Sequence, residues 1–288
     1  MRFSADCVPC LLNRVLYEVE LVAPERTEEA MAAALEIMAP RYRQGMNSAK
    51  LATQIHAAAY RISGSKDPYL DLKVRSNEAA LAVLEKARGL VEAAPDRLEA
   101  ACLAALIGNV MDFGIDVGMV GPEALRDHFD SLWAEGIQVN EVAELRRLLQ
   151  RSKKVLYLMD NCGEVVLDLL LVEEIRKLGP EVVGVYKGEP ILTDATGEDM
   201  VLAGLDRAFD RLLSTGMFAV GIDMARASPE LHQEMESADL IISKGMANFE
   251  SLSDEAYRPV AFLLRTKCRP VAQAIGAAEG QNVVRVWP

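Results

Sequence analysis

The sequence predicts an α/β fold in which a mostly parallel β-sheet carries helices on both faces and follows a helical N-terminal domain. Up to about residue 150, apolar residues recur at helical spacing, and no β-branched run resembles a buried strand. From residue 153 onward, short apolar runs alternate with helical segments, as in parallel sheets covered by helices. We therefore expect a helical domain at 1–150 and an α/β domain at 151–288.

The first half contains five segments that we expect to form helices. One begins at Thr27, whose side chain is a suitable N-cap, and continues through residues rich in Ala, Glu and Met. Another ends before Pro95, and a turn near Gly136 separates the last two. The expected helices are 27–39, 76–93, 97–110, 122–135 and 140–151.

The second half begins with the apolar run at 155–160, which follows two lysines and precedes a glycine turn, as a buried parallel strand does. The helix after it ends at Gly179 and Pro180. The expected strands are 155–160, 182–187, 210–214, 239–245, 260–266 and 283–288, and the expected helices are 164–179, 198–207 and 229–237.

Composition narrows the classes of function. Hydrophobic residues make up 51% of the 288 positions, enough for a packed core. The net charge of −12 disfavours nucleic acid as a partner, although a bound cation can reverse the local field for a small phosphorylated substrate. We expect a soluble, cytoplasmic protein without a membrane partner, because no apolar stretch can span a bilayer and no secretory signal is present.

Polar residues follow three of the expected strands, at 160–164, 189–194 and 243–248. In open α/β sheets, ligands bind at the carboxyl ends of the strands, so we expect these loops to converge on one edge. Their convergence predicts a single site built from the three loops.

The first of these loops contains Asp160 and Asn161, whose side-chain oxygens are hard ligands suited to Mg²⁺ or Mn²⁺. Gly163 permits close approach of the backbone, and the helix that begins near Glu164 offers its positive end to an anion. The alternative is that Asp160 or Asn161 only caps this helix, and the residues alone leave both open.

Asp194 follows the second strand, where it is a candidate third metal ligand or a turn residue. Asp199 falls in the following helix, where we expect it to face solvent. After the third strand, Lys244 and Gly245 precede a helix and are suited to hold a phosphate by charge and by backbone N–H groups. The alternative for Lys244 is a surface lysine beside a turn. Asn248 either binds substrate or caps the helix, and Glu250 either positions Lys244 or faces water.

Cys7 and Cys10 form a CxxC pair, which suggests a metal or redox site. A tetrahedral zinc site needs a second pair of ligands, which Cys162 and Cys268 supply only if the fold brings them close. Cys102 lies in an apolar helix and is expected in the core. The total of five cysteines is odd, which argues against a disulfide framework.

Other polar residues have simpler interpretations. Capping or buried hydrogen bonding is the first explanation for the polar residues of the helical half, and surface exposure is the first explanation for the histidines, which show no pairing suited to a metal. The polar residues are Lys73, Asn77, Asn109 and Asp112, and the histidines are His56, His128 and His232.

These motifs together resemble the damage-control phosphatase family, also called the domain-of-unknown-function eighty-nine family, and in particular its small prokaryotic stand-alone branch with an N-terminal CxxC. The DNxGE motif at 160–164 and the KGxxNFE motif at 244–250 are specific as a pair. The resemblance covers essentially the whole chain, through stretches 7–14, 71–77, 108–114, 160–168, 188–196, 243–252 and 263–272.

The resemblance implies a helical region packed on a Rossmann-like α/β domain. It implies a divalent metal, Mn²⁺, Mg²⁺, Co²⁺ or Ni²⁺, held by Asp160, Asn161 and Asp194, and it implies small phosphate monoesters such as sugar phosphates or damaged metabolites as substrates. Lys244 would bind the phosphate, and two polar residues would reach the site from the helical half, Asn109 and Asp112.

Two positions depart from the family pattern. Thr193 stands where the family loop often has Asn, which leaves the ligand Asp194 in place but changes its neighbour. Cys162 stands where a small residue is usual, and a thiol beside the metal would favour softer metals or oxidative inactivation.

Metal-dependent phosphatase activity is the leading hypothesis, with Asp160 and Lys244 as catalytic residues and with water, rather than Asp160, as the expected nucleophile. One alternative is an S-adenosylmethionine-dependent carboxyl methyltransferase, which the lack of a GxGxG turn after the first strand weakens. Another is a non-enzymatic metal or redox module at Cys7 and Cys10, which leaves the strand-end carboxylates unexplained.

Overall fold

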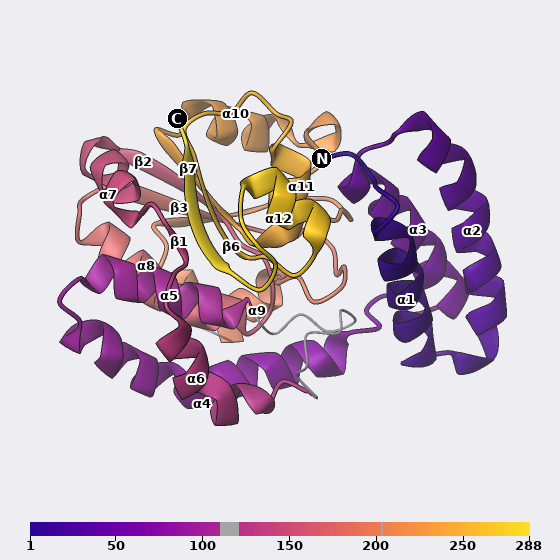
Figure 1. The fold of residues 1–288 in the computed structure, drawn as a ribbon, viewed down its shortest axis with the longest axis horizontal. Coiled ribbons are helices and arrows are strands. Elements are labelled where there is room, and N and C mark those ends of the chain that lie inside the picture. Colours follow the sequence, from indigo (N-terminus) through magenta and orange to yellow (C-terminus); the bar gives the residue numbers. More distant parts are fainter. Residues whose placement is uncertain (110–120, 203) are drawn as a thin grey trace.

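A seven-stranded sheet forms the centre of the computed structural model, which describes residues 1–109, 121–202 and 204–288 (Figure 1). The strand order is β1-β7-β6-β5-β2-β3-β4. Neighbouring strands pair in parallel except β6 and β7, which confirms the expected α/β class with a mostly parallel sheet. The strands are Val139–Asn140 (β1), Lys154–Leu158 (β2), Glu181–Tyr186 (β3), Arg211–Ser214 (β4), Leu240–Lys244 (β5), Val260–Arg265 (β6) and Asn282–Trp287 (β7).

The described residues also form twelve α-helices. They are Cys7–Glu20 (α1), Thr27–Gln44 (α2), Ser48–Ser63 (α3), Leu70–Ala93 (α4), Arg97–Gly108 (α5), Ala124–Glu135 (α6), Val142–Arg151 (α7), Glu164–Arg176 (α8), Gly197–Leu202 (α9), Pro229–Ser237 (α10), Gly245–Leu252 (α11) and Arg269–Ile275 (α12). None of the helices in these ranges is both long enough and apolar enough to cross a bilayer.

The side chains of β2 alternate between two apolar cores, one on each face of the sheet. Val155 and Tyr157 pack with residues of α4, α5 and α8, whereas Leu156 and Leu158 pack with residues of α10, α11 and α12. Successive side chains of a strand point to opposite faces, so a strand that is apolar throughout must be covered on both sides. The order of elements therefore produces the three layers seen in Figure 1.

Helices α1, α2 and α3 form a separate bundle at one end of the molecule, next to α11 and α12 (Figure 1). Their shared apolar cluster includes Leu11, Val15, Ala34 and Ile55. Helices α4 to α7 instead contribute to the core under one face of the sheet. The domain boundary expected at residue 150 stays a prediction, and this shared core includes residues from both sides of it.

Several element boundaries differ from the sequence-based expectations. The helix expected at 76–93 begins earlier, at Leu70, and the helix expected at 198–207 ends at Leu202. Gly204, with a φ of +71°, lies between this helix and a short 3-10 helix at Leu205–Arg207, because a left-handed residue interrupts α-helical hydrogen bonding. Strand β7 runs antiparallel to β6, a reversal that the alternation of strands and helices did not indicate.

Candidate functional site

The site lies where the strand order reverses. From β2 the chain continues to β3 on one side, whereas β5 pairs with β2 on the other side. Such a switch point leaves a crevice at the carboxyl ends of the two central strands, which is where open α/β sheets bind ligands. Asp160 follows β2 and Gly245 follows β5, so both lie at this edge.

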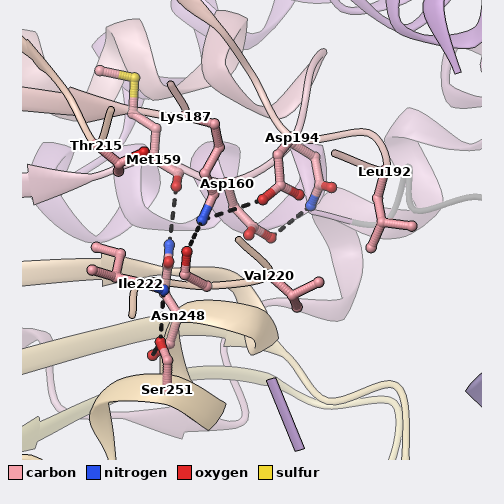
Figure 2. Close-up of polar contacts among 12 residues, drawn as sticks. Met159, Asp160, Lys187, Leu192, Asp194, Thr215, Val220, Ile222, Asn248 and Ser251 are labelled. Carbon is pink, nitrogen blue, oxygen red and sulfur yellow. Dashed lines mark hydrogen bonds and ion pairs between the residues drawn. The ribbon is translucent and has the colours of Figure 1, made fainter. Parts of the chain in front are cut away.

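Backbone hydrogen bonds hold the two acidic loops together. The N–H of Cys162 donates to the carbonyl of Thr193 at 2.8 Å, and the N–H of Ala195 donates to the carbonyl of Asp160 at 2.8 Å. Asn161 and Asp194 thereby form an antiparallel bridge. The structure thus brings Asp160, Asn161 and Asp194 together, and Figure 2 shows the carboxylates of Asp160 and Asp194 side by side.

The carboxylate of Asp160 is buried and tightly surrounded. Its Oδ2 accepts hydrogen bonds from Asn161 Nδ2 at 2.6 Å and Asn109 Nδ2 at 3.2 Å. Its Oδ1 is buried without a hydrogen-bond partner among the described residues. A Cβ on Gly245 would lie 1.8 Å from Oδ2, so only glycine leaves room for this carboxylate.

Burial raises the pKa of Asp160 well above its ordinary value, and the neighbouring carboxylates of Asp194 and Glu164 raise it further. Lys187 and Lys267 lower this pKa by their positive charge. Lys187 reaches between the loops, with its Nζ 3.3 Å from Asp194 Oδ2 and donating to the carbonyl of Gly221 (Figure 2). The two adjacent buried carboxylates therefore favour a bound proton or a bound cation at the strand ends.

These oxygens fit a hard divalent cation. Asp160 and Asp194 provide carboxylates, and Asn161 provides an amide oxygen that already accepts a hydrogen bond from Thr193 Oγ1 at 2.6 Å. Thr193, one of the two departures from the family pattern, therefore orients the amide. Across the described ranges, no three His, Cys, Asp or Glu side chains are grouped to hold a metal, so the amide completes the predicted set.

Lys244 lies elsewhere than the sequence indicated. Its Nζ donates to Glu164 Oε1 and Asp168 Oδ1, both at 2.6 Å, and to the carbonyl of Ala105 at 3.2 Å. The side chain is 0% exposed and does not line the cavity described below. With all three N–H groups engaged, Lys244 cannot contact a phosphate in this arrangement, and the expectation of direct contact is corrected accordingly.

Glu164 is also buried rather than exposed to a ligand. It accepts from Lys244 and, through Oε2, from Asn109 Nδ2 at 2.6 Å. Asn109 therefore links α5 to both Glu164 and Asp160. Asp112, its expected companion, lies outside the described residues. Glu250 does not position Lys244, as one expectation had it, but lines the cavity.

The N–H of Gly163 is used inside the protein, where it donates to Asn77 Oδ1 at 2.6 Å. Asn77 in turn donates to Asp199 Oδ1 at 3.0 Å, so Asp199 is buried and not solvated as expected. Asn248 donates to the carbonyls of Met159 and Lys244, both at 2.9 Å. Gly163 and Asn248 therefore brace the backbone of the loops, and neither lines the cavity.

A cavity of about 130 Å³ opens above the acidic loops. Asp160, Asn161 and Asp194 line one part of it, and helices α1 and α3 line another. Helix α3 is fixed to the strand-end loops by two hydrogen bonds, from the N–H of Leu192 to Tyr60 Oη at 2.8 Å and from the N–H of Val220 to Thr53 Oγ1 at 2.9 Å. Among the described residues that line it, Arg14 and Lys267 have positively charged side chains.

The thiols divide between the cavity and the core. Cys7, Cys10 and Cys268 line the cavity, which joins the CxxC pair to the predicted metal site. Burial raises the pKa of Cys268 to about 12. Cys162, expected beside the metal, is buried and does not line the cavity, and its burial raises its pKa well above the usual range.

The expectation that the histidines are surface residues is confirmed for the exposed His128 and is wrong for the buried His56. His56 is 0% exposed, and its Nδ1 lies 2.9 Å from both carboxylate oxygens of Glu18, which is equally buried. The available signal in the sequence was Glu18 itself, an acidic residue between the apolar positions Val15 and Val19 on one helix.

Comparisons with known sequences and structures all find members of one family. A sequence model of the damage-control phosphatase ARMT1-like domain matches residues 3–283. A damage-control phosphatase of Archaeoglobus fulgidus is 40% identical over 288 residues, covering 99% of both chains, and one of Pyrococcus horikoshii is 31% identical, covering 98% of this chain and 97% of that one. The crystal structure of a DUF89 family protein from P. horikoshii superposes with a TM-score of 0.88 at 31% identity and covers 99% of both chains.

Proposed function

The chain belongs to the damage-control phosphatase ARMT1-like domain family, and on this premise we propose that it hydrolyses small phosphate monoesters with the help of a divalent cation. The observation that carries the proposal is the pair of buried carboxylates, Asp160 and Asp194, on two loops joined by backbone hydrogen bonds. Asp160 Oδ1 lacks a hydrogen-bond partner among the described residues, as expected of an oxygen reserved for a cation.

Asp160, Asn161 and Asp194 would hold the cation, and Mn²⁺, Mg²⁺, Co²⁺ and Ni²⁺ are the candidates. When bound, such an ion neutralises the charge of a phosphate and polarises an oxygen. The protein supplies the rest: Lys267 and Arg14 provide positive charge on the cavity wall for the phosphate oxygens. Lys244 keeps Glu164 in place, and Glu164 in turn fixes Asn109, which contacts Asp160.

The substrate is a small phosphorylated metabolite, such as a sugar phosphate. The size of the cavity suits a compact molecule, and its wall combines the charged groups with apolar residues such as Phe3 and Leu11. A water molecule, rather than Asp160, is the proposed nucleophile, because the carboxylate of Asp160 would be engaged as a ligand of the cation.

The test is a panel of phosphate esters assayed with each of the four metals on the purified protein. Asp160→Asn and Asp194→Asn are expected to lower kcat/KM by about 100-fold or more, because each removes a charged ligand. Asp206→Asn, at an exposed aspartate of the Leu205–Arg207 turn, is the matched control and should leave activity unchanged. Full turnover and full metal uptake in Asp194→Asn would refute the assignment.

A further inference from the structure

The pair formed by Glu18 and His56 has no part in the function proposed so far. Glu18 comes from α1 and His56 from α3, and both side chains are 0% exposed. His56 Nδ1 lies 2.9 Å from Glu18 Oε1 and 2.9 Å from Glu18 Oε2. A carboxylate only accepts hydrogen bonds, so Nδ1 carries the hydrogen and the ring is held in one orientation.

The other ring nitrogen of His56 is left for a ligand. Nε2 is buried and has no hydrogen-bond partner among the described residues. His56 nevertheless lines the cavity that also contains Asp160, Asn161 and Asp194. A buried polar atom without a partner is costly unless a ligand satisfies it, and here the cavity is where that ligand would sit.

The placement of α3 puts His56 on the wall of the same cavity as the acidic loops. The acidic loops belong to the strand ends, whereas His56 belongs to the N-terminal bundle, which the hydrogen bonds of Tyr60 and Thr53 fix over those loops. A phosphate ester held by the strand ends can therefore place its ester oxygen against the helical part of the wall, where His56 lies.

We propose that His56 is a catalytic residue that protonates the leaving group, with Glu18 as its positioning residue; this inference rests on the proposed phosphatase function. Nε2 gives its proton to the ester oxygen as the phosphorus–oxygen bond breaks and that oxygen takes the bonding electron pair. The oxygen of a water molecule forms the new bond to phosphorus. The proton that this water loses restores the charge of the imidazole through solvent, so alcohol and phosphate are the only products.

The experiment compares two esters that differ in their need for an acid. Leaving groups of high pKa, such as the alcohol of glycerol phosphate, need protonation, whereas the phenolate of p-nitrophenyl phosphate departs without it. His56→Asn keeps an amide N–H to donate to Glu18 but removes the proton at Nε2. We expect kcat for glycerol phosphate to fall about 100-fold or more and kcat for p-nitrophenyl phosphate to fall less than about 5-fold, with KM little changed.

Two further variants complete the design. His128→Asn, on the exposed surface of α6, is the matched control and should behave as wild type on both esters. Glu18→Gln keeps an acceptor for Nδ1 but removes the charge, so it should show a smaller loss that is again confined to glycerol phosphate. If His56→Asn does not fold, Glu18→Gln still tests whether His56 protonates the leaving group. In each variant, hydrolysis of p-nitrophenyl phosphate shows that the site is folded.

Equal loss on both esters, or loss on neither, would overturn the catalytic role of His56 while leaving the phosphatase function intact. A wild-type protein that hydrolyses neither ester with any of the four metals would overturn the proposed function and this inference with it.

Discussion

Gly245 is the residue whose identity the site constrains most directly. Its φ is +71°, and a Cβ there would lie 1.8 Å from Asp160 Oδ2. We expect Gly245→Ala to displace the carboxylate of Asp160 and to lower kcat/KM by about 100-fold, because a displacement of about 1 Å in an active site can cost that much. Steady-state kinetics on a phosphate ester measure this loss.

Gly64→Ala is the matched control for that substitution. Gly64 has a φ of +75°, and nothing lies within 4 Å of a Cβ built there. Alanine at this position meets only the backbone strain, about 1 kcal/mol, and should leave turnover unchanged. Similar kinetics for the two variants would contradict the close approach of Gly245 to Asp160.

The raised pKa of Asp160 predicts how metal affinity depends on pH. Burial raises the pKa of its carboxyl well above the ordinary value, so a proton stays bound at pH values where an exposed aspartate is ionised. This proton must leave when a cation binds, and the affinity for Mn²⁺ should therefore rise with pH and level off once Asp160 is ionised. Calorimetric titrations across about pH 5 to 8 test this, and an affinity independent of pH would argue against Asp160 as a ligand.

Lys244 joins β5 to α8 through its ion pairs with Glu164 and Asp168. Lys244→Met leaves two buried carboxylates without their cation and should lower the free energy of unfolding by about 3–5 kcal/mol. Lys154→Met, at a partly exposed lysine paired with Glu234, is the control, and its cost should stay below about 1 kcal/mol. Chemical denaturation of both variants provides the measurement.

The loss of stability expected in Lys244→Met should depend on pH, because the nearby carboxyl of Asp168 titrates. Burial raises the pKa of Asp168 from 3.8 to about 6, so the folded protein binds a proton more readily than the unfolded chain does. The free energy of unfolding therefore falls as pH rises through this window. Lys244 opposes the shift, so its removal should make the fall steeper and the penalty larger at about pH 7 than at about pH 5. A penalty that shrinks with rising pH would contradict the ion-pair geometry.

The strand ends were the most predictable elements. The apolar run before Asp160 and the strand-end rule indicated both acidic loops, and the structure brings these loops together. The burial of Lys244 was not predicted, although the alternation of side chains along β5 indicates it. Ile242 packs in the core that includes α5 and α8, and Lys244, two residues later, enters the same face.

The pairing of Glu18 with His56 was beyond prediction from one sequence. These residues belong to different helices, and their contact depends on how α1 packs against α3. The burial of Asp199 escaped prediction for the same reason, because its partner Asn77 comes from α4. Local patterns specify which residues form a helix, but the packing of helices decides which polar side chains meet.

At the scale of the whole molecule, the cavity joins the two ends of the chain. Cys7 and Cys10 come from α1, and Cys268 precedes α12. The half-buried Cys7 and Cys10 should react with a maleimide in the folded protein, and Cys268 should react slowly because burial raises the pKa of its thiol to about 12. The buried Cys102 and Cys162 should react only after unfolding. Labelling should abolish ester hydrolysis, because the maleimide adducts fill the cavity. Inorganic phosphate with Mn²⁺ should slow the labelling.

A variant with serine at Cys7, Cys10 and Cys268 provides the control, since it should stay active after treatment with the reagent. Mass spectrometry of the folded and denatured protein identifies the labelled positions. Undiminished hydrolysis after labelling of Cys7 and Cys10 would contradict their position on the wall of the cavity.

The bundle of α1, α2 and α3 has an apolar cluster that, among the described residues, includes none from the sheet. Residues up to Ser63, where α3 ends, therefore have an apolar core of their own, while the hydrogen bonds of Tyr60 and Thr53 join them to the strand-end loops. Mutations in this bundle can reshape the cavity while the loops keep their geometry. During divergence, such a chain can acquire a preference for a new phosphate ester through its first helices and retain the same hydrolytic chemistry.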